Sequence, residues 1–154
     1  MLGFPRVFDE DEKVEYISFQ SEDIVFDLSH SDQSEAWITA VVEKESKKLG
    51  PITFIFCSDN YLHQLNVQYL RHDTLTDIIT FPYGELPEVS GDIFISVERV
   101  AENAKKYAAT FEQELSRVMV HGVLHLCGYK DKTPAEQQQM RAKEDEMLLL
   151  KESF

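Results

Sequence analysis

The stretch HGVLHLCGYKD, residues 121–131, carries the side chains best suited to chemistry. His121 and His125 are four residues apart, a spacing that puts two side chains on one face of a helix, one turn apart. Gly128 can adopt a left-handed conformation that ends the helix, so that the chain can fold back and present Asp131. Two imidazole nitrogens and one carboxylate oxygen, with a fourth position open to water, are typical of catalytic zinc sites. The pattern predicts one zinc ion per chain, bound by His121, His125 and Asp131.

Two neighbouring positions limit other interpretations of this stretch. A pair of histidines alone is more often packing or surface chance, but the added glycine and carboxylate favour a metal site. Cys127 is expected on a different face of the helix, as a small buried hydrophobe. Zinc peptidases use HExxH, in which the glutamate is the general base. Here that position is Gly122, which disfavours a metallopeptidase.

Length and composition predict a single domain over residues 1–154. The formal net charge of −13 argues against general attraction to nucleic acid, and therefore against a DNA or membrane partner. The charge is uneven, because residues 99–132 hold six basic and four acidic residues. The segment with the histidines is thus the part that could tolerate a polyanion. Only two cysteines are present, which is typical of a protein of the reducing cytoplasm.

Periodicity and turn residues predict a mixed order of helices and strands. Asp32 and Glu35 form a plausible helix cap pair, and Gly50 after two lysines is a helix stop signal. Ser58 is a good helix N-cap, and Thr133 with Pro134 has the start pattern of the last helix. The order indicates an α+β fold, in which a small mixed sheet of about four strands is covered mainly on one side by helices and the metal site lies at the end of a late helix. Extended segments are expected at 14–28, 51–57, 75–81 and 92–97, a loop at 82–91, and helices at 32–49, 58–70, 98–109, 111–127 and from 134.

Several stretches, taken in order, resemble the YbeY-type endoribonucleases, also called rRNA maturation factors. HGVLHLCGY is similar to the core signature of this family, LNVQYL with LTDIITF to its LN…TDVLSF segment, and GDIFIS to its GDIxIS strand. Met140 and Glu144 fall where the family has a methionine and a glutamate. The resemblance covers roughly residues 50–145. It implies a zinc-dependent, single-strand-specific ribonuclease that matures the 3′ end of small-subunit rRNA and acts in ribosome quality control.

The chain departs from the family pattern at two positions. Most members have a histidine as the third ligand, where this chain has Asp131. A carboxylate donates more negative charge than an imidazole, so a bound water should be acidified less. The family also has an arginine, thought to serve catalysis, where this chain has Leu70. Arg71 follows one residue later and is the candidate for that role; a shift of one residue turns a helical side chain by about 100°, so the sequence leaves open whether it substitutes.

The resemblance suggests phosphodiester cleavage in which zinc acidifies water and polarises a phosphoryl oxygen. Arg71 would neutralise charge that develops on the phosphate. Glu114, two helical turns before His121, is a candidate for a supporting role behind the ligands, with an exposed helix residue as the alternative. Asp77 and Asp92 are expected to fix turns at strand ends. The alternative functions are a ribosome-assembly factor with a structural zinc and, less favoured, a metallopeptidase.

Overall fold

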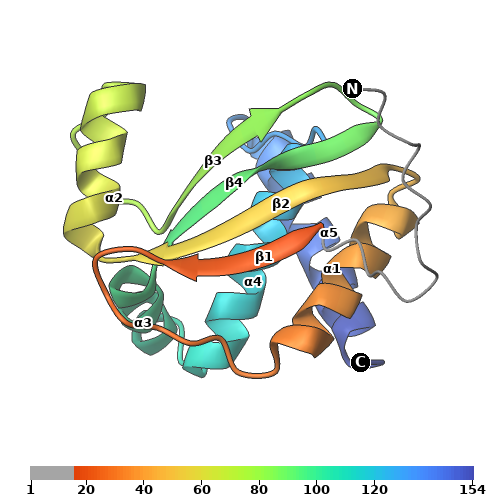
Figure 1. Cartoon of the computed structure of the whole chain (residues 1–154), viewed down its shortest axis with the longest axis horizontal. Coiled ribbons are helices and arrows are strands. Elements are labelled where there is room, and N and C mark those ends of the chain that lie inside the picture. Colours follow the sequence, from red (N-terminus) through yellow and green to blue (C-terminus); the bar gives the residue numbers. More distant parts are fainter. Residues whose placement is uncertain (1–15) are drawn as a thin grey trace, which may run out of the picture.

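The computed structural model describes residues 16–154. Residues 14 and 15, the start of the extended segment expected at 14–28, lie outside this part. Figure 1 shows a twisted sheet with helices α1, α4 and α5 on one face. The elements are β1 (Ile17–Ser21), α1 (Ser31–Lys44), β2 (Lys48–Cys57), α2 (Asp59–Leu65), the π-helix η1 (Asn66–Leu70), β3 (Ile78–Tyr83), β4 (Glu88–Ser96), α3 (Val97–Lys106), α4 (Phe111–Leu126) and α5 (Pro134–Lys151).

The sheet has four strands in the order β1-β2-β4-β3. β1, β2 and β4 run parallel, and β3 is antiparallel to β4. The parallel strands are joined through helices, as the long crossovers of parallel pairs require. The expected α+β class with a small mixed sheet is therefore confirmed.

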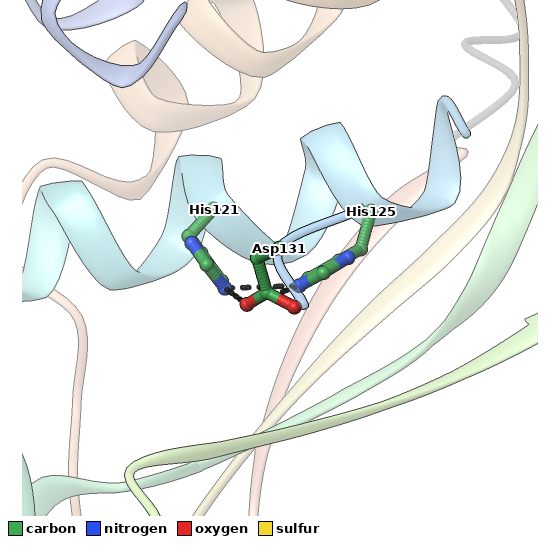
Figure 2. Close-up of side chains that lie close together, drawn as sticks. All are labelled: His121, His125 and Asp131. Atoms are coloured by element: carbon green, nitrogen blue, oxygen red, sulfur yellow. Dashed lines mark hydrogen bonds and ion pairs between the residues drawn. The ribbon is translucent and has the colours of Figure 1, made fainter. Parts of the chain in front are cut away.

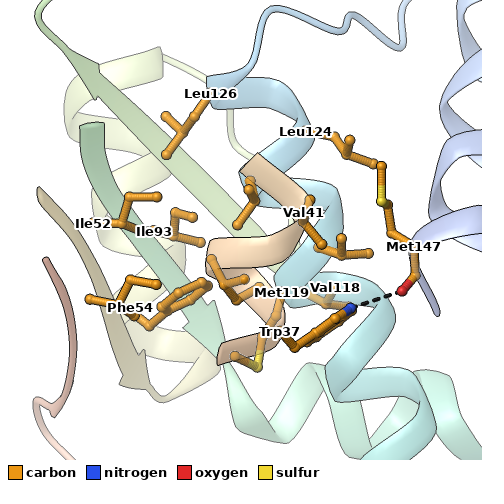
Figure 3. Packing of buried hydrophobic residues seen from close by; sticks show 14 of the residues in the cluster. Trp37, Val41, Ile52, Phe54, Ile93, Val118, Met119, Leu124, Leu126 and Met147 are labelled. Atoms are coloured by element: carbon orange, nitrogen blue, oxygen red, sulfur yellow. Dashed lines mark hydrogen bonds between the residues drawn. The ribbon is translucent and has the colours of Figure 1, made fainter. Parts of the chain in front are cut away.

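The main core lies between the sheet and the helices α1, α4 and α5, as Figure 3 shows. Trp37 of α1 is fully buried at its centre, and its indole nitrogen donates a hydrogen bond to the carbonyl oxygen of Met147 in α5, at 2.8 Å. This bond satisfies the only polar atom of the indole, which burial would otherwise leave unpaired. It also ties α5 to α1 across the core.

Helix α4 crosses the sheet at close range at Gly122. A Cβ atom at this position would lie 2.8 Å from Cδ1 of Ile78 and 2.9 Å from Cγ2 of Ile93, closer than van der Waals contact permits. The absence of a side chain lets the helix approach β3 and β4. Position 122 therefore faces the sheet, so a peptidase-type glutamate there would point into the core and away from the histidines. This observation weighs further against the metallopeptidase alternative.

The opposite face of the sheet is partly covered by α2. Cys57, Leu62 and Ile79 form a second buried cluster there, with Phe81 and Phe94 packed against it. The expectation that the strand at 51–57 is buried on both faces is met at its end, where Phe56 and Cys57 are both buried but belong to different clusters. The helix expected at 58–70 continues after α2 as the π-helix η1.

Helix α1 differs from the expectation at both ends. Its N-cap is His30 in a left-handed conformation, and Asp32 lies inside the first turn instead of capping it. The helix ends at Lys44, because Ser46 takes the left-handed turn (φ 57°) that Gly50 was expected to make. Gly50 lies within β2 instead.

The other boundaries move by a few residues. β3 runs on to Tyr83 and β4 already begins at Glu88, so the loop expected at 82–91 is much shorter. Ser58 and Thr133 do cap their helices, each accepting a hydrogen bond from a backbone N–H, and Thr133 forms a full capping box with Glu136. None of the helices in residues 16–154 combines the length and apolar character that crossing a bilayer requires.

Candidate metal centre

The two histidines of the motif lie on the last two turns of α4, with their rings side by side. The Nε2 atoms of His121 and His125 are 3.0 Å apart, and Oδ2 of Asp131 lies 3.3 Å from the first and 3.2 Å from the second. Figure 2 shows the three side chains pointing to one spot. They are the one group of this kind found among the described residues.

Hydrogen bonds at the other ring nitrogens fix which atoms face this spot. Nδ1 of His121 lies 2.7 Å from Oε2 of Glu144, and Nδ1 of His125 lies 2.9 Å from the carbonyl oxygen of Tyr129. Ionised carboxylate and carbonyl oxygens only accept hydrogen bonds, so both Nδ1 atoms carry the hydrogen. In the neutral rings, both Nε2 atoms then present lone pairs, which is the form that binds metals.

The donor set fits a divalent ion. Two lone pairs and a carboxylate oxygen converge at 3.0–3.3 Å with no hydrogen between them in the neutral rings, so a cation is the natural partner. Three ligand atoms at bond lengths of about 2.0–2.1 Å lie about 2.8–3.4 Å apart in octahedral or tetrahedral coordination. The observed triangle therefore has the size that such an ion requires, and further coordination positions stay open.

A tight turn after α4 brings the carboxylate back to the helix. The N–H of Gly128 donates to the carbonyl of His125, and the N–H of Tyr129 donates to that of Leu124, the pattern of a Schellman motif. Gly128 has a φ of 109°, as expected from the sequence, and residues with a side chain rarely adopt this conformation. The same turn places the carbonyl of Tyr129 against His125 and Asp131 beside both rings.

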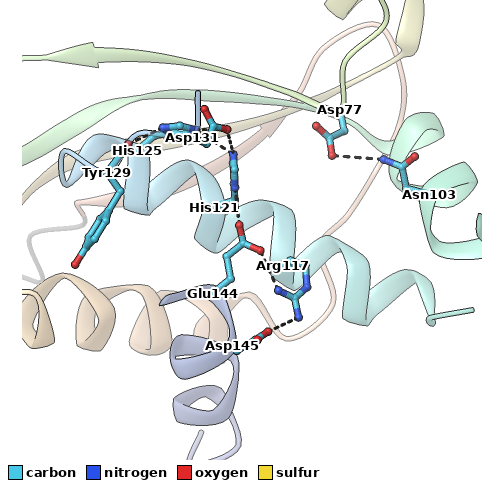
Figure 4. A network of polar contacts seen from close by, with 9 residues as sticks. All are labelled: Asp77, Asn103, Arg117, His121, His125, Tyr129, Asp131, Glu144 and Asp145. Carbon is cyan, nitrogen blue, oxygen red and sulfur yellow. Dashed lines mark hydrogen bonds and ion pairs between the residues drawn. The ribbon is translucent and has the colours of Figure 1, made fainter. Parts of the chain in front are cut away.

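Glu144 of α5 holds His121 from behind. The residue is 95% buried. Its carboxylate accepts hydrogen bonds from Nδ1 of His121 and, at 2.9 Å, from Nη1 of Arg117, whose Nη2 donates to Asp145 at 2.8 Å. Figure 4 shows this network running from the candidate metal ligands to α5. Burial acts to raise the pKa of Glu144, but the hydrogen bonds from His121 and Arg117 outweigh it and hold the pKa below its ordinary value.

The pKa of His121 reflects the same contacts. Burial acts to lower it, while the hydrogen bond and charge of Glu144, with the charges of Asp131 and Asp77, outweigh burial and raise it. The sequence analysis noted that Glu144 falls where the family has a glutamate but predicted no role for it. It predicted no role for Arg117 either. A signal for Arg117 was present, because it precedes His121 by four residues and so shares its helix face.

A cleft of about 1180 Å³ borders His121 and Asp131 and continues along α4 towards its N-terminus. Glu114 lines this cleft and is 92% buried, so the alternative of an exposed helix residue is wrong. Asp77, expected only to fix a turn, also lines the cleft, and its side chain lies 3.5 Å from Nδ2 of Asn103 (Figure 4). Burial raises the pKa of both carboxyl groups.

Arg71 lies outside the lining of this cleft. It follows η1 in a left-handed conformation (φ 56°), is exposed, and is not among the residues that line the cleft. It does belong to the segment that leads into Asp77 at the cleft wall. Its catalytic role therefore stays a prediction.

Cys127 is buried, and burial together with the charge of Glu45 raises its pKa to about 12. The thiol therefore stays protonated near neutral pH and is no part of the three-residue group. It packs in the main core, as the sequence analysis expected.

Comparison with known proteins identifies the family of this chain and a solved structure of similar fold. The family model described as Endoribonuclease YbeY matches residues 16–151. Proteins named Endoribonuclease YbeY from Flavobacterium johnsoniae and Flavobacterium psychrophilum are 54% and 53% identical, covering 81% and 87% of this chain and 90% and 95% of their own length. The solution structure of TM1509 from Thermotoga maritima matches with a TM-score of 0.58 at 27% identity, over 89% of this chain and 92% of that one. The chain belongs to the endoribonuclease YbeY family.

The third ligand can be tested through metal content. We expect about one divalent ion per wild-type chain and a large loss in an Asp131→Ala variant, because two imidazoles alone hold such an ion weakly. Elemental analysis of the purified proteins measures this. Asp27→Ala removes the same charge at an exposed position outside the cleft and should keep the metal. Unchanged metal in Asp131→Ala would remove Asp131 from the site.

The support from α5 has its own test. Glu144→Gln should weaken metal affinity about 10–100-fold, because the carboxylate that orients His121 and raises its basicity is lost. Competition with a chelator of known affinity measures the change, and circular dichroism checks the fold. Arg117→Gln leaves the bond between Glu144 and His121 in place and should have a smaller effect. Equal affinities for wild type and Glu144→Gln would contradict the orienting role.

Proposed function

We propose that the protein is a zinc-dependent, single-strand-specific endoribonuclease of the cytoplasm that matures the 3′ end of small-subunit rRNA and acts in ribosome quality control. Its partners would be single-stranded rRNA and the small ribosomal subunit. The observation that carries the proposal is the convergence of two imidazoles and one carboxylate beside an open cleft, in a chain of the endoribonuclease YbeY family. Its relatives are named for endoribonuclease activity. The two cysteines, which are free thiols, suit a reducing compartment.

Zinc is the proposed ion because two nitrogens and one oxygen with an open position are typical of catalytic zinc. Two histidines and one carboxylate also suit iron(II), so the metal analysis above should cover both ions. When bound, such an ion acidifies water and polarises a phosphoryl oxygen. His121, His125 and Asp131 would hold the ion, and the turn at Gly128 would set its distance from α4.

Other residues would act on the RNA and on protons. Glu114 and Asp77 are buried or half-buried carboxyls on the cleft wall with raised pKa values, which suits them to carry a proton to the leaving oxygen. Arg71, at the end of η1, would bind a phosphate and neutralise charge as the bond breaks.

A ribosome-assembly factor with a structural zinc is the second candidate. The net charge of −13 and the position of Arg71 outside the cleft lining favour it, because both reduce attraction to RNA near the metal. A structural zinc, however, is usually closed by four protein ligands, whereas the described residues bring three together.

An assay on purified full-length protein separates the candidates. We expect cleavage of a single-stranded RNA, little cleavage of the same sequence as a duplex, and none of casein. A chelator should abolish cleavage and added zinc should restore it. His121→Ala, prepared in parallel, controls for contaminating ribonuclease. Intact RNA after incubation with fully metal-loaded protein would favour the assembly factor. Digestion of casein would support the metallopeptidase alternative.

Arg71 is tested by substitution. Arg71→Ala should lower the cleavage rate at least tenfold, about 1.4 kcal/mol of transition-state stabilisation, with metal content and fold unchanged. Leu70→Arg in that background places an arginine where the family has one and should recover part of the rate. If Arg71→Ala cleaves RNA at the wild-type rate, Arg71 is ordinary surface.

A further inference from the structure

The cleft beside the metal ligands is lined by more acidic than basic side chains. Six carboxyl groups line it, those of Asp77, Glu112, Glu114, Asp131, Glu144 and Glu152. The lysines and arginines on its wall are Arg117, Arg141 and Lys151. An RNA strand that enters this cleft is a polyanion, so it needs a cation that is free to contact phosphate.

Two of these three cations are already engaged within the protein. Arg117 donates to Glu144 and Asp145 through both terminal nitrogens. Lys151 donates to Oγ of Ser116 at 2.8 Å, and its Nζ lies 5.4 Å from the centre of the Trp37 ring. Arg141 is exposed and has no hydrogen bond or ion pair within residues 16–154.

The pairing of α4 with α5 places Arg141 near the metal ligands. Later residues of α5 meet earlier residues of α4, since Lys151 contacts Ser116 whereas Glu144, earlier in α5, contacts both Arg117 and His121. Arg141 lies about one turn before Glu144 on α5. It lines the same cleft as His121 and Asp131, and it lies one turn from the carboxylate that contacts His121.

The pKa of Glu114, which lines the same cleft, agrees with this placement of Arg141. Burial raises the pKa of Glu114, and the positive charges of Arg117 and Arg141 both oppose that rise. The guanidinium of Arg141 is thus close enough to act on a carboxyl of the cleft wall.

We propose that Arg141 is the cation that binds an RNA phosphate inside the cleft, next to the metal ligands. The proposal deepens, and rests on, the proposed ribonuclease function. A guanidinium suits this task because its planar donors match two phosphate oxygens at once and it stays charged at any physiological pH. Arg71, outside the cleft lining, would then contact the strand further along its backbone.

The test compares Arg141→Gln with two other variants. Arg141→Lys keeps the charge without the planar fork. Lys48→Gln removes one charge at an exposed position at the start of β2, outside the cleft lining. Binding of a fluorescent single-stranded RNA is followed over a range of salt concentrations, before measurable cleavage, and cleavage rates are then determined. Metal content is checked for each protein.

We expect Arg141→Gln to bind RNA more weakly, with a salt slope reduced by about 0.7, the value for one phosphate contact to a single strand. Its cleavage rate should fall at least tenfold, Arg141→Lys should lie between it and wild type, and metal content should stay unchanged. Arg141→Gln that matches Lys48→Gln in slope and rate would overturn the proposal, as would wild-type protein that does not bind RNA. Wild-type protein that binds RNA but does not cleave it would contradict the proposed function. The salt slope of binding would still test the role of Arg141.

Discussion

The hydrogen bond between His121 and Glu144 is the contact on which the site depends. It joins α4 to α5 and is made by the carboxylate of Glu144, a residue that is 95% buried. A buried carboxylate without partners costs several kcal/mol, and the hydrogen bonds from His121 and Arg117 of α4 offset this cost for Glu144. The same bond assigns the hydrogen to Nδ1. Packing of α5 against α4 therefore also leaves the Nε2 lone pair of neutral His121 free to bind a metal.

The second histidine is oriented in a different way. Nδ1 of His125 faces a backbone carbonyl that the turn at Gly128 supplies, so no side chain has to arrive from another element. The sheet contributes the remaining constraint, since the close contact at Gly122 directs that side of α4 into the core and leaves the histidine side facing the cleft. One ligand therefore depends on tertiary packing and the other on local backbone geometry.

This difference explains what could be predicted from the sequence. The helical spacing of His121 and His125 and the turn at Gly128 are local, so the three converging residues could be named before the structure was known. Glu144 makes its contact across 23 positions of the chain, and no periodicity shows which residue of α5 meets α4. Which residues line the cleft together could not be predicted for the same reason. Arg141, Asp77 and Glu114 come together only through packing.

The fold was predictable to a similar depth. The strands and helices were found from apolar runs, periodicity and turn residues, and Ser58 and Thr133 mark helix starts through local hydrogen bonds. The end of α1 was misplaced because Ser46, a residue with a side chain, adopts the left-handed turn usually left to glycine. The π-helix η1 was not expected, since its sequence differs little from that of an α-helix.

The connection from Asp131 through His121 to Glu144 also bears on how long the protein survives in a cell. Asp131 lies just before the start of α5 and Glu144 in its middle, so an ion bound by the histidines would fasten the C-terminal helix at two points. Ligands that bind only the native state add to the free energy of unfolding, by about 4 kcal/mol at a thousand times the dissociation constant. Metal supply would thus affect how often α5 detaches and exposes the core around Trp37 to proteases. Metal starvation would then lower the amount of the protein through faster degradation.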